Sequence, residues 1–272
     1  METNFGTMKM VRALDNLQKK IQTKVQITGA TLKIIAIVTM LIDHIGAALI
    51  EQGVWFKIDP NAKVDRVYAY DEIFRIIGRI SFPLFCFLVV EGILHTRDVR
   101  KYAIRLGIFA IISEIPFNLA FSNKVVDFSG FNVFFTLFIS VSVVAGYIAI
   151  KESTQKFYEE PQVKWFLCTT IFLVGLLVAG VTNTDYDVAG VCAIMVMYEF
   201  SSRNAKNLGF VAAILLLALL DDPIELWALL GFGLILMYNG KRGRQMKYFF
   251  YMFYPMHLML LWAIRCYIMY YM

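Results

Sequence analysis

The stretch from Lys33 to Gly46, KIIAIVTMLIDHIG, is an apolar run of helix length that contains an aspartate and a histidine. An ionisable residue inside a bilayer is costly, so its presence points to a functional site. Lys33 and His44 are separated by about three helical turns and therefore lie on one helix face, roughly 16 Å apart along the axis. Such a face could hold a long anionic molecule at its charged end and carry out acid–base chemistry at the other.

The composition is that of a membrane protein. Of the 272 residues, 59% are hydrophobic and only 17% are charged, which would be unusual for a soluble protein of this length. The net charge of +5 does not indicate nucleic-acid binding, because basic residues in a membrane protein report topology first.

The apolar stretches predict an all-α, polytopic transmembrane bundle with nine to ten spans. The nine candidate spans are residues 32–50, 73–94, 102–121, 133–150, 165–181, 188–200, 208–220, 224–238 and 248–270. The sixth to eighth are short, so their ends are uncertain and one pair could be re-entrant. Residues 1–30 alternate apolar and basic side chains at helical spacing, which predicts an amphipathic segment at the cytoplasmic membrane surface or a solvated basic tail. Its insertion would add the tenth span, and residues 31–272 form the membrane domain.

The charges of the connecting loops alternate along the chain. Basic residues gather in the N-terminal segment and in residues 97–105, 151–164, 203–206 and 241–247, whereas the other loops are acidic. The positive-inside rule therefore predicts a cytoplasmic N-terminus and an external C-terminus.

With this orientation, polar residues from four spans fall at one depth. They are Asp43, His44, Arg79, Glu114 and His257. Polar groups in lipid cost several kcal/mol each unless they are paired, so we expect these groups to converge inside the bundle. Arg75 and Asn118 lie near the same depth.

Structural roles are the alternative for several of these residues. Asp43 could form an ion pair with Arg75 or Arg79, Glu114 could satisfy amides freed by the adjacent proline, and His257 could be a hydrogen-bond donor of the bundle. A three-histidine zinc site is not expected, because one of the three histidines, His95, lies at another depth.

A second feature is the glycine-flanked turn YNGKRGRQMK at residues 238–247. Its residues Lys241, Arg242 and Arg244 could bind phosphate groups through charge and forked donors, or could only enforce topology. Together with Lys33, this turn would form a cationic face on the cytoplasmic side.

Six segments together resemble the TraX family, whose namesake acetylates the N-terminus of pilin. They are LKIIAIVTMLIDHIG (32–46), RIIGRISFPLFCFLVVEGILHTR (75–97), RLGIFAIISEIPFNLAF (105–121), NVFFTL (132–137), DYDVAGV (185–191) and YNGKRGRQMKYFFYMFYPMHLMLL (238–261). The family is similar to larger membrane acyltransferases that carry a basic residue, ten others and an essential histidine in an early span, a spacing that Lys33 and His44 fit.

The resemblance implies an acetyltransferase of the bacterial plasma membrane. Acetyl-CoA would enter from the cytoplasm, and the acceptor would be an amine or hydroxyl of a peptide or glycan of the cell envelope. Lys33 and the 241–244 turn would bind the cofactor, with His44 as general base or acyl-bearing nucleophile.

The remaining polar residues would assist this chemistry. Asp43 or Glu114 would orient the imidazole of His44, and His257 is a second acid–base candidate. Arg75, Arg79 and Asn118 would stabilise the oxyanion or hold the acceptor. No metal is required.

Two other classes fit parts of the pattern. A proton-coupled secondary transporter would also place carboxylates in mid-membrane beside proline-broken helices, although no sequence repeat is visible. A non-catalytic envelope assembly factor would use the same polar groups only as a structural network.

Overall fold

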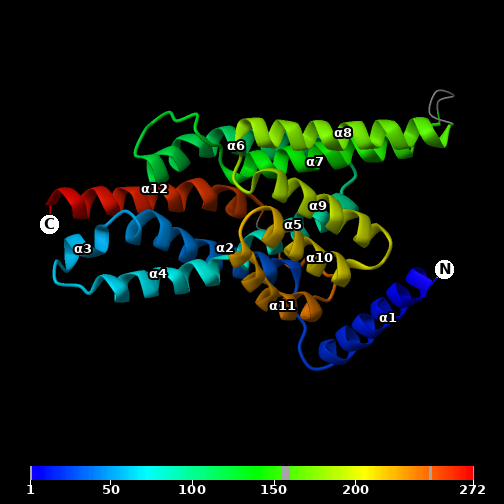
Figure 1. Ribbon diagram of the computed structural model, residues 1–272, viewed down its shortest axis with the longest axis horizontal. Helices are drawn as coiled ribbons and strands as arrows, with labels where there is room; N and C mark the ends of the chain where they lie inside the picture. The colour runs from blue at the N-terminus through cyan, green and yellow to red at the C-terminus, as the bar shows by residue number, and fades with distance from the viewer. Residues whose placement is uncertain (1, 155–159, 245–246, 272) are drawn as a thin grey trace.

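The computed structural model describes residues 2–154, 160–244 and 247–271. Within these ranges the chain is helical, with two isolated backbone bridges, Ile27 with Tyr238 and Phe131 with Thr184 (Figure 1). The elements are α1 (Glu2–Gln22), α2 (Gly29–Ile45), η1 (Gly46–Ile50), α3 (Val54–Ile58), α4 (Val64–Gly78), α5 (Ser81–His95), α6 (Val99–Ser122), α7 (Val133–Lys151), α8 (Pro161–Thr182), α9 (Asp187–Ser202), α10 (Lys206–Leu220), η3 (Pro223–Gly231), α11 (Phe232–Met237) and α12 (Lys247–Tyr271).

Six passes in the described part of the chain are long and apolar enough to cross a bilayer, which makes this an α-helical membrane protein. They are Gly29–Ile50, Val64–His95, Val99–Ser122, Val133–Lys151, Pro161–Thr182 and Tyr248–Tyr271. The segments that correspond to the sixth, seventh and eighth predicted spans are shorter: α9 has 16 residues, α10 has 15, and η3 with α11 covers Pro223–Met237. The total of nine to ten spans stays a prediction.

The second predicted span differs from the expected continuous helix over residues 73–94. The pass begins at Val64 and breaks after Gly78, so that Arg79 and Ile80 join α4 to α5. Pro83 is tolerated because it lies in the first turn of α5, where the missing N–H has no helical partner. The break places Arg79 at a helix junction in the middle of the pass.

The α2 pass is also irregular. It continues from Ile45 into the π-helix η1, and such π segments often occur at functional sites. Gly46 opens η1, and a Cβ there would lie 2.8 Å from Asp71 Oδ1. The side chains of α4 therefore approach this turn closely, two residues beyond His44.

The apolar core joins most of the helices. Among its fully buried side chains are Leu32, Phe87, Phe210, Ile214 and Leu258. By contrast, the apolar window of α8 is only 11% buried, against 61% for the α4–α5 pass, so α8 packs at the edge of the bundle with α7 (Figure 1). The exposed apolar side chains of α8 form a surface suited to lipid.

Helix α1 docks at one end of this bundle. Its Gln18 is buried and donates to the carbonyls of Ile235 and Tyr238, while Gln22 donates to Tyr238 at 2.6 Å. These side chains add hydrogen bonds to backbone carbonyls at the end of α11.

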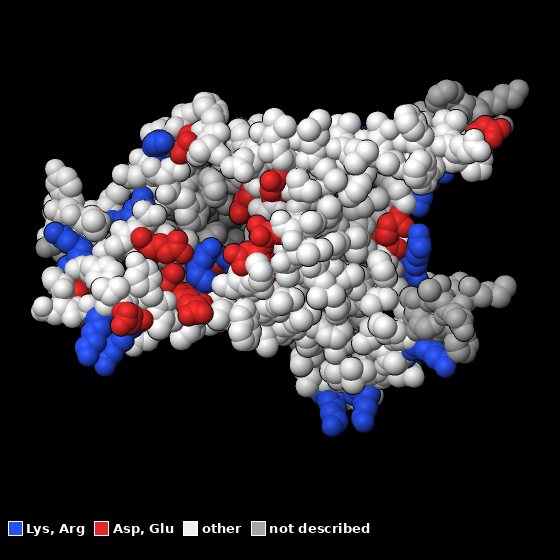
Figure 2. Space-filling view, in the orientation of Figure 1, with Lys and Arg blue, Asp and Glu red and all other residues white. Residues whose placement is uncertain are grey.

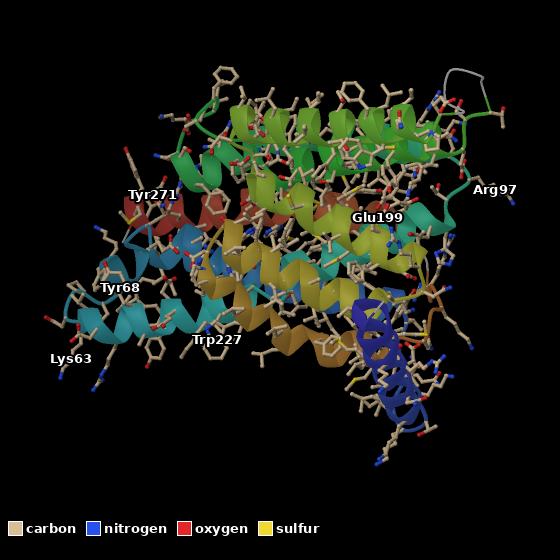
Figure 3. All side chains as sticks on the ribbon, turned by 45° about the vertical axis from the view of Figure 1, so that its right-hand side comes forward. Lys63, Tyr68, Arg97, Glu199, Trp227 and Tyr271 are labelled. Carbon is tan, nitrogen blue, oxygen red and sulfur yellow. The ribbon has the colours of Figure 1, made fainter. Side chains whose placement is uncertain are left out.

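The loops after α5, α9 and α11 share one end of the bundle. Arg242 in the loop before α12 donates to the carbonyl of His95 at 2.9 Å, which joins that loop to the end of α5. Figure 3 shows Arg97 and Glu199 toward this end and Lys63 at the opposite one. These basic loops therefore lie at the same end of the bundle, as the alternation of loop charge predicts. The assignment of this end to the cytoplasm stays a prediction.

Cysteine labelling tests this orientation. Lys63→Cys and Arg97→Cys replace exposed residues at opposite ends, each in a variant whose four native cysteines are replaced. An impermeant maleimide added to intact cells should label position 63 and should label position 97 only after permeabilisation. Labelling of position 97 in intact cells would reverse the predicted orientation.

Candidate active site

A network of ion pairs is buried where α2 meets the α4–α5 break. Asp43 Oδ2 is 2.8 Å from Arg75 Nη1, and Asp43 Oδ1 is 2.8 Å from Arg79 Nη2. Arg79 Nη1 is also 2.8 Å from Glu225 Oε1, and the Glu225 side chain is fully buried. Arg75 reaches Glu51 at 3.4 Å. Buried charges are tolerated when they are paired in this way, and the pairs tie α2, α4 and η3 together.

The position of Asp43 depends on the absence of a side chain at Gly78. A Cβ at residue 78 would lie 2.1 Å from Asp43 Oδ1 and 2.3 Å from Asp43 Cβ. The backbone at the end of α4 therefore packs directly against the aspartate. This contact presents Asp43 to Arg79, which follows Gly78 in the chain.

His44 and His257 form a hydrogen-bonded pair between α2 and α12. His44 Nδ1 is 2.7 Å from His257 Nε2, and His257 Nδ1 is 2.7 Å from the carbonyl oxygen of Phe253. A carbonyl only accepts, so His257 Nδ1 carries a proton and the Nε2 of the neutral ring is an acceptor. His44 therefore donates through Nδ1 and retains a lone pair on Nε2.

This tautomer leaves His44 as a base. None of the described residues forms a hydrogen bond with His44 Nε2, and His44 lines a cavity. The arrangement follows the general pattern of a catalytic base whose other nitrogen is held by an orienting partner. His257 is the orienting partner here, and the Phe253 carbonyl fixes its tautomer.

The cavity has a volume of about 400 Å³. Of the residues predicted from sequence, it is lined by His44, Arg75 and Arg79; Asp185 and Tyr254 also line it. Figure 2 shows acidic side chains gathered round a hollow of the surface, with a basic side chain among them. The acidic residues that line the cavity are Asp185, Asp221 and Asp222, the rim aspartates.

The short helices end at this cavity. Asp185 and Tyr186 precede α9, whereas Asp221 and Asp222 lie between α10 and η3. A helix of 15 residues is roughly 22 Å long, which is less than the thickness of a hydrocarbon core, about 30 Å. Because these helices stop short, their connections lie beside the passes that carry His44 and Arg79.

The connection before α9 is held in an unusual backbone conformation. Asn183, Tyr186 and Asp187 have φ values of 47°, 61° and 37°, a region that side chains other than glycine seldom adopt. The Tyr186 ring stacks on Phe82 with centroids 3.6 Å apart, and the Asp185 N–H donates to the Phe131 carbonyl at 2.8 Å. Backbone strain of this kind is frequent at functional sites.

The carboxyl group of Asp185 titrates near neutral pH. Burial raises the pKa of Asp185 to about 6, because the charged form loses hydration. The cavity therefore contains a carboxyl group that can exchange a proton in the physiological range.

Two predicted residues lie elsewhere. Glu114 Oε2 accepts from Asn132 Nδ2 at 2.6 Å, so the structure pairs Glu114 with the N-cap of α7 and not with His44. Asn118 is buried on the same helix, and its Oδ1 has no partner in the described part of the chain. Neither residue is among those that line the cavity.

The predicted cofactor-binding residues gather at the basic end of the bundle. Lys33 Nζ is 5.4 Å from the centre of the Phe250 ring, and Arg242 is close enough to act on this ammonium group electrostatically. The backbone carbonyls of Lys241 and Arg242 each accept from the first turn of α2 at 2.9 Å. Arg244 is exposed in the same turn. These four cations lie outside the cavity lining.

Several residues of the site were missed by sequence reasoning. Glu225 had a usable signal, because it is a carboxylate inside the predicted span 224–238, and the rule that identified Asp43 applies to it as well. Asp185 looked like an ordinary loop charge. Tyr254 had no distinguishing signal, since tyrosine is common in membrane helices and at their interfaces.

Known proteins resemble this chain over most of its length. The sequence model of a protein family, described as TraX protein, matches residues 28–265. The chain is also 25% identical over 260 residues to a probable fimbrial assembly protein, FimC of serogroup H1, from Dichelobacter nodosus; the match covers 87% of this chain and 95% of that protein. No solved structure matches the chain.

The contact at Gly78 yields a stability prediction. Gly78→Ala should displace Asp43 and separate it from Arg79, and breaking a buried ion pair costs about 3–5 kcal/mol. The thermal unfolding midpoint in detergent should fall sharply. Gly233→Ala is the matched control, because a Cβ there meets no atom within 4 Å. Equal midpoints for the two variants would contradict the packing described.

Proposed function

This chain belongs to the TraX protein family, and from this premise we propose that it is an integral-membrane acetyltransferase. It would transfer the acetyl group of cytosolic acetyl-CoA to an acceptor at the outer side of the membrane. The observation that carries the proposal is the hydrogen-bonded His44–His257 pair, which leaves an imidazole base facing a cavity inside the bundle.

The reaction of a neutral acceptor balances with one base. The acceptor nitrogen or oxygen attacks the thioester carbonyl, and its proton passes to His44 Nε2. The carbon–sulfur bond then breaks, and the leaving thiolate takes up the proton to give CoA and the acetylated acceptor. Asp43 supports this step indirectly, because its pairs with Arg75 and Arg79 fix the last turn of α2.

The charges of the cavity favour an amine over a hydroxyl acceptor. Asp43 and Glu225 neutralise much of the field of Arg75 and Arg79. The negative charges of the three rim aspartates, Asp185, Asp221 and Asp222, are then not balanced by positive charge among the residues that line the cavity. An acidic cavity attracts cations, and of the two acceptors only the amine arrives as a cation. This ammonium group must release one proton, to a rim carboxylate or to water, before its lone pair can attack.

The donor would bind from the other end of α2. Lys33 and the turn with Lys241, Arg242 and Arg244 present cations for the CoA phosphates. The axial distance from Lys33 to His44 is roughly 16 Å, a reach comparable with that of the pantetheine arm. This basic end would face the cytoplasm of a bacterial cell, with the protein in its plasma membrane.

A second candidate is a non-catalytic assembly factor. The relative from Dichelobacter nodosus is named a probable fimbrial assembly protein, and this name favours a role in building envelope structures. In that case the polar groups would be structural. The name equally suits an enzyme that acetylates an envelope peptide, so a transfer assay separates the two candidates.

Two variants test the division of roles along α2. His44→Ala should abolish acetyl transfer to envelope material while CoA binding is retained, whereas Lys33→Ala should weaken CoA binding. Transfer is followed with radiolabelled acetyl-CoA, and binding by the thermal shift that CoA produces in purified protein. Wild-type turnover by the His44→Ala protein would remove His44 from the mechanism, and a wild-type protein without CoA binding or transfer would favour the assembly factor.

The role of His257 is tested by a pair of substitutions. His257→Gln keeps an acceptor for His44 Nδ1 and a donor for the Phe253 carbonyl, so it should retain a substantial part of the activity. His257→Ala removes both and should cost about 10²–10⁴-fold in transfer rate. If the glutamine variant is as inactive as the alanine variant, His257 takes part in proton transfer and does not merely orient His44.

A further inference from the structure

Three of the five N–H donors of the Arg79 guanidinium are already committed. Its Nε donates to the Arg75 carbonyl at 3.2 Å, and Nη1 and Nη2 donate to Glu225 and Asp43 at 2.8 Å each. Two carboxylates also cancel most of its positive field. Because acyl transfer depends on hydrogen bonds aimed at the developing charge, a donor that is not paired with carboxylates would be better placed to stabilise an oxyanion in the cavity.

The hydroxyl of Tyr254 is a buried donor without an assigned partner. Tyr254 is 3% exposed, it lines the cavity, and its oxygen has no hydrogen-bond partner among the described residues. Buried hydroxyls are nearly always hydrogen-bonded, so an unpaired one calls for an explanation such as a bound group. The Tyr254 hydroxyl is thus available to whatever occupies the cavity.

The surrounding rings fix the Tyr254 ring beside the imidazole of His44. The Tyr254 ring meets the His44 ring edge-on, with centroids 6.0 Å apart, and the His257 ring at 5.7 Å. On another side Phe134 contacts it edge-on at 5.2 Å. A ring held by three neighbours keeps its hydroxyl in one place, as a preorganised donor must be held.

The start of α7 adds a favourable field at the same place. Val133, the first residue of this 19-residue helix, lines the cavity, and its backbone amide lies close to the Tyr254 oxygen without reaching hydrogen-bond geometry. An amide on that side leaves the hydroxyl proton directed elsewhere. The positive end of the helix dipole also favours negative charge here.

We propose that Tyr254 is a catalytic residue whose hydroxyl donates a hydrogen bond to the thioester oxygen as it becomes an oxyanion. This inference rests on the proposed acetyl transfer. It assigns to α12 and the start of α7 the oxyanion-binding role that was predicted for Arg75, Arg79 and Asn118. As the acceptor attacks, the carbonyl π electrons move to the oxygen and the Tyr254 hydroxyl stabilises that charge. When the carbon–sulfur bond breaks, the carbonyl re-forms and the hydroxyl keeps its proton.

Tyr254→Phe tests this role, because it removes only the hydroxyl and retains the ring contacts. The maximal rate of CoA release from acetyl-CoA should fall about 10²–10³-fold, as for loss of one oxyanion donor, while KM for acetyl-CoA stays within about threefold. The thermal midpoint should not decrease, because the hydroxyl has no partner to lose. The assay uses full-length protein in nanodiscs with envelope extract as acceptor.

Tyr251→Phe is the matched control. Tyr251 lies one turn earlier on α12, and its ring stacks on Phe109 with centroids 4.7 Å apart. Because Tyr251 is not among the residues that line the cavity, removing its hydroxyl should leave the rate of CoA release nearly unchanged. Wild-type rates in Tyr254→Phe, or a lowered midpoint, would overturn the inference and leave the acetyltransferase proposal intact. A wild-type protein that neither binds CoA nor releases it from acetyl-CoA would overturn both.

Discussion

A charge inside a hydrocarbon layer must be paired, and the pairing of Arg79 governs this protein. Arg79 lies between Asp43 and Glu225, and the bonds join α2, the α4–α5 break and η3. Removing one partner of such a buried pair destabilises the protein by more than the intact pair stabilises it. The pairs therefore hold the three elements in fixed positions relative to one another. Gly78 allows α4 to approach Asp43 closely enough for the pairing.

This constraint also directs the chemistry. Consecutive residues of a helix differ by about 100° in direction, so fixing Asp43 toward the arginines fixes His44 toward α12. There it meets His257, whose own tautomer is set by the Phe253 carbonyl. The ion pairs therefore hold the helix, the helix presents the imidazole, and the short helices leave the space in which it can act.

Sequence reasoning predicted which polar residues come together better than it predicted the elements that carry them. Depth alone predicted that Asp43, His44, Arg79 and His257 converge, because isolated polar groups are too costly in lipid. The same rule could not predict direction, and Glu114, at equal depth, turns to Asn132 instead. The helical character of the spans follows from hydropathy. The break after Gly78 depends on tertiary contact with Asp43, which hydropathy does not contain.

The central claim is that acetyl-CoA binds at the basic end of α2 and that its thioester reaches the His44 imidazole, which is buried within the bundle. Sealed proteoliposomes with one protein orientation test it most directly, with labelled acetyl-CoA on one side and envelope acceptor on the other. The account predicts acetylated acceptor only when acetyl-CoA is on the side of the basic loops. Equal transfer with acetyl-CoA on the acidic side, or none from either side, would contradict it.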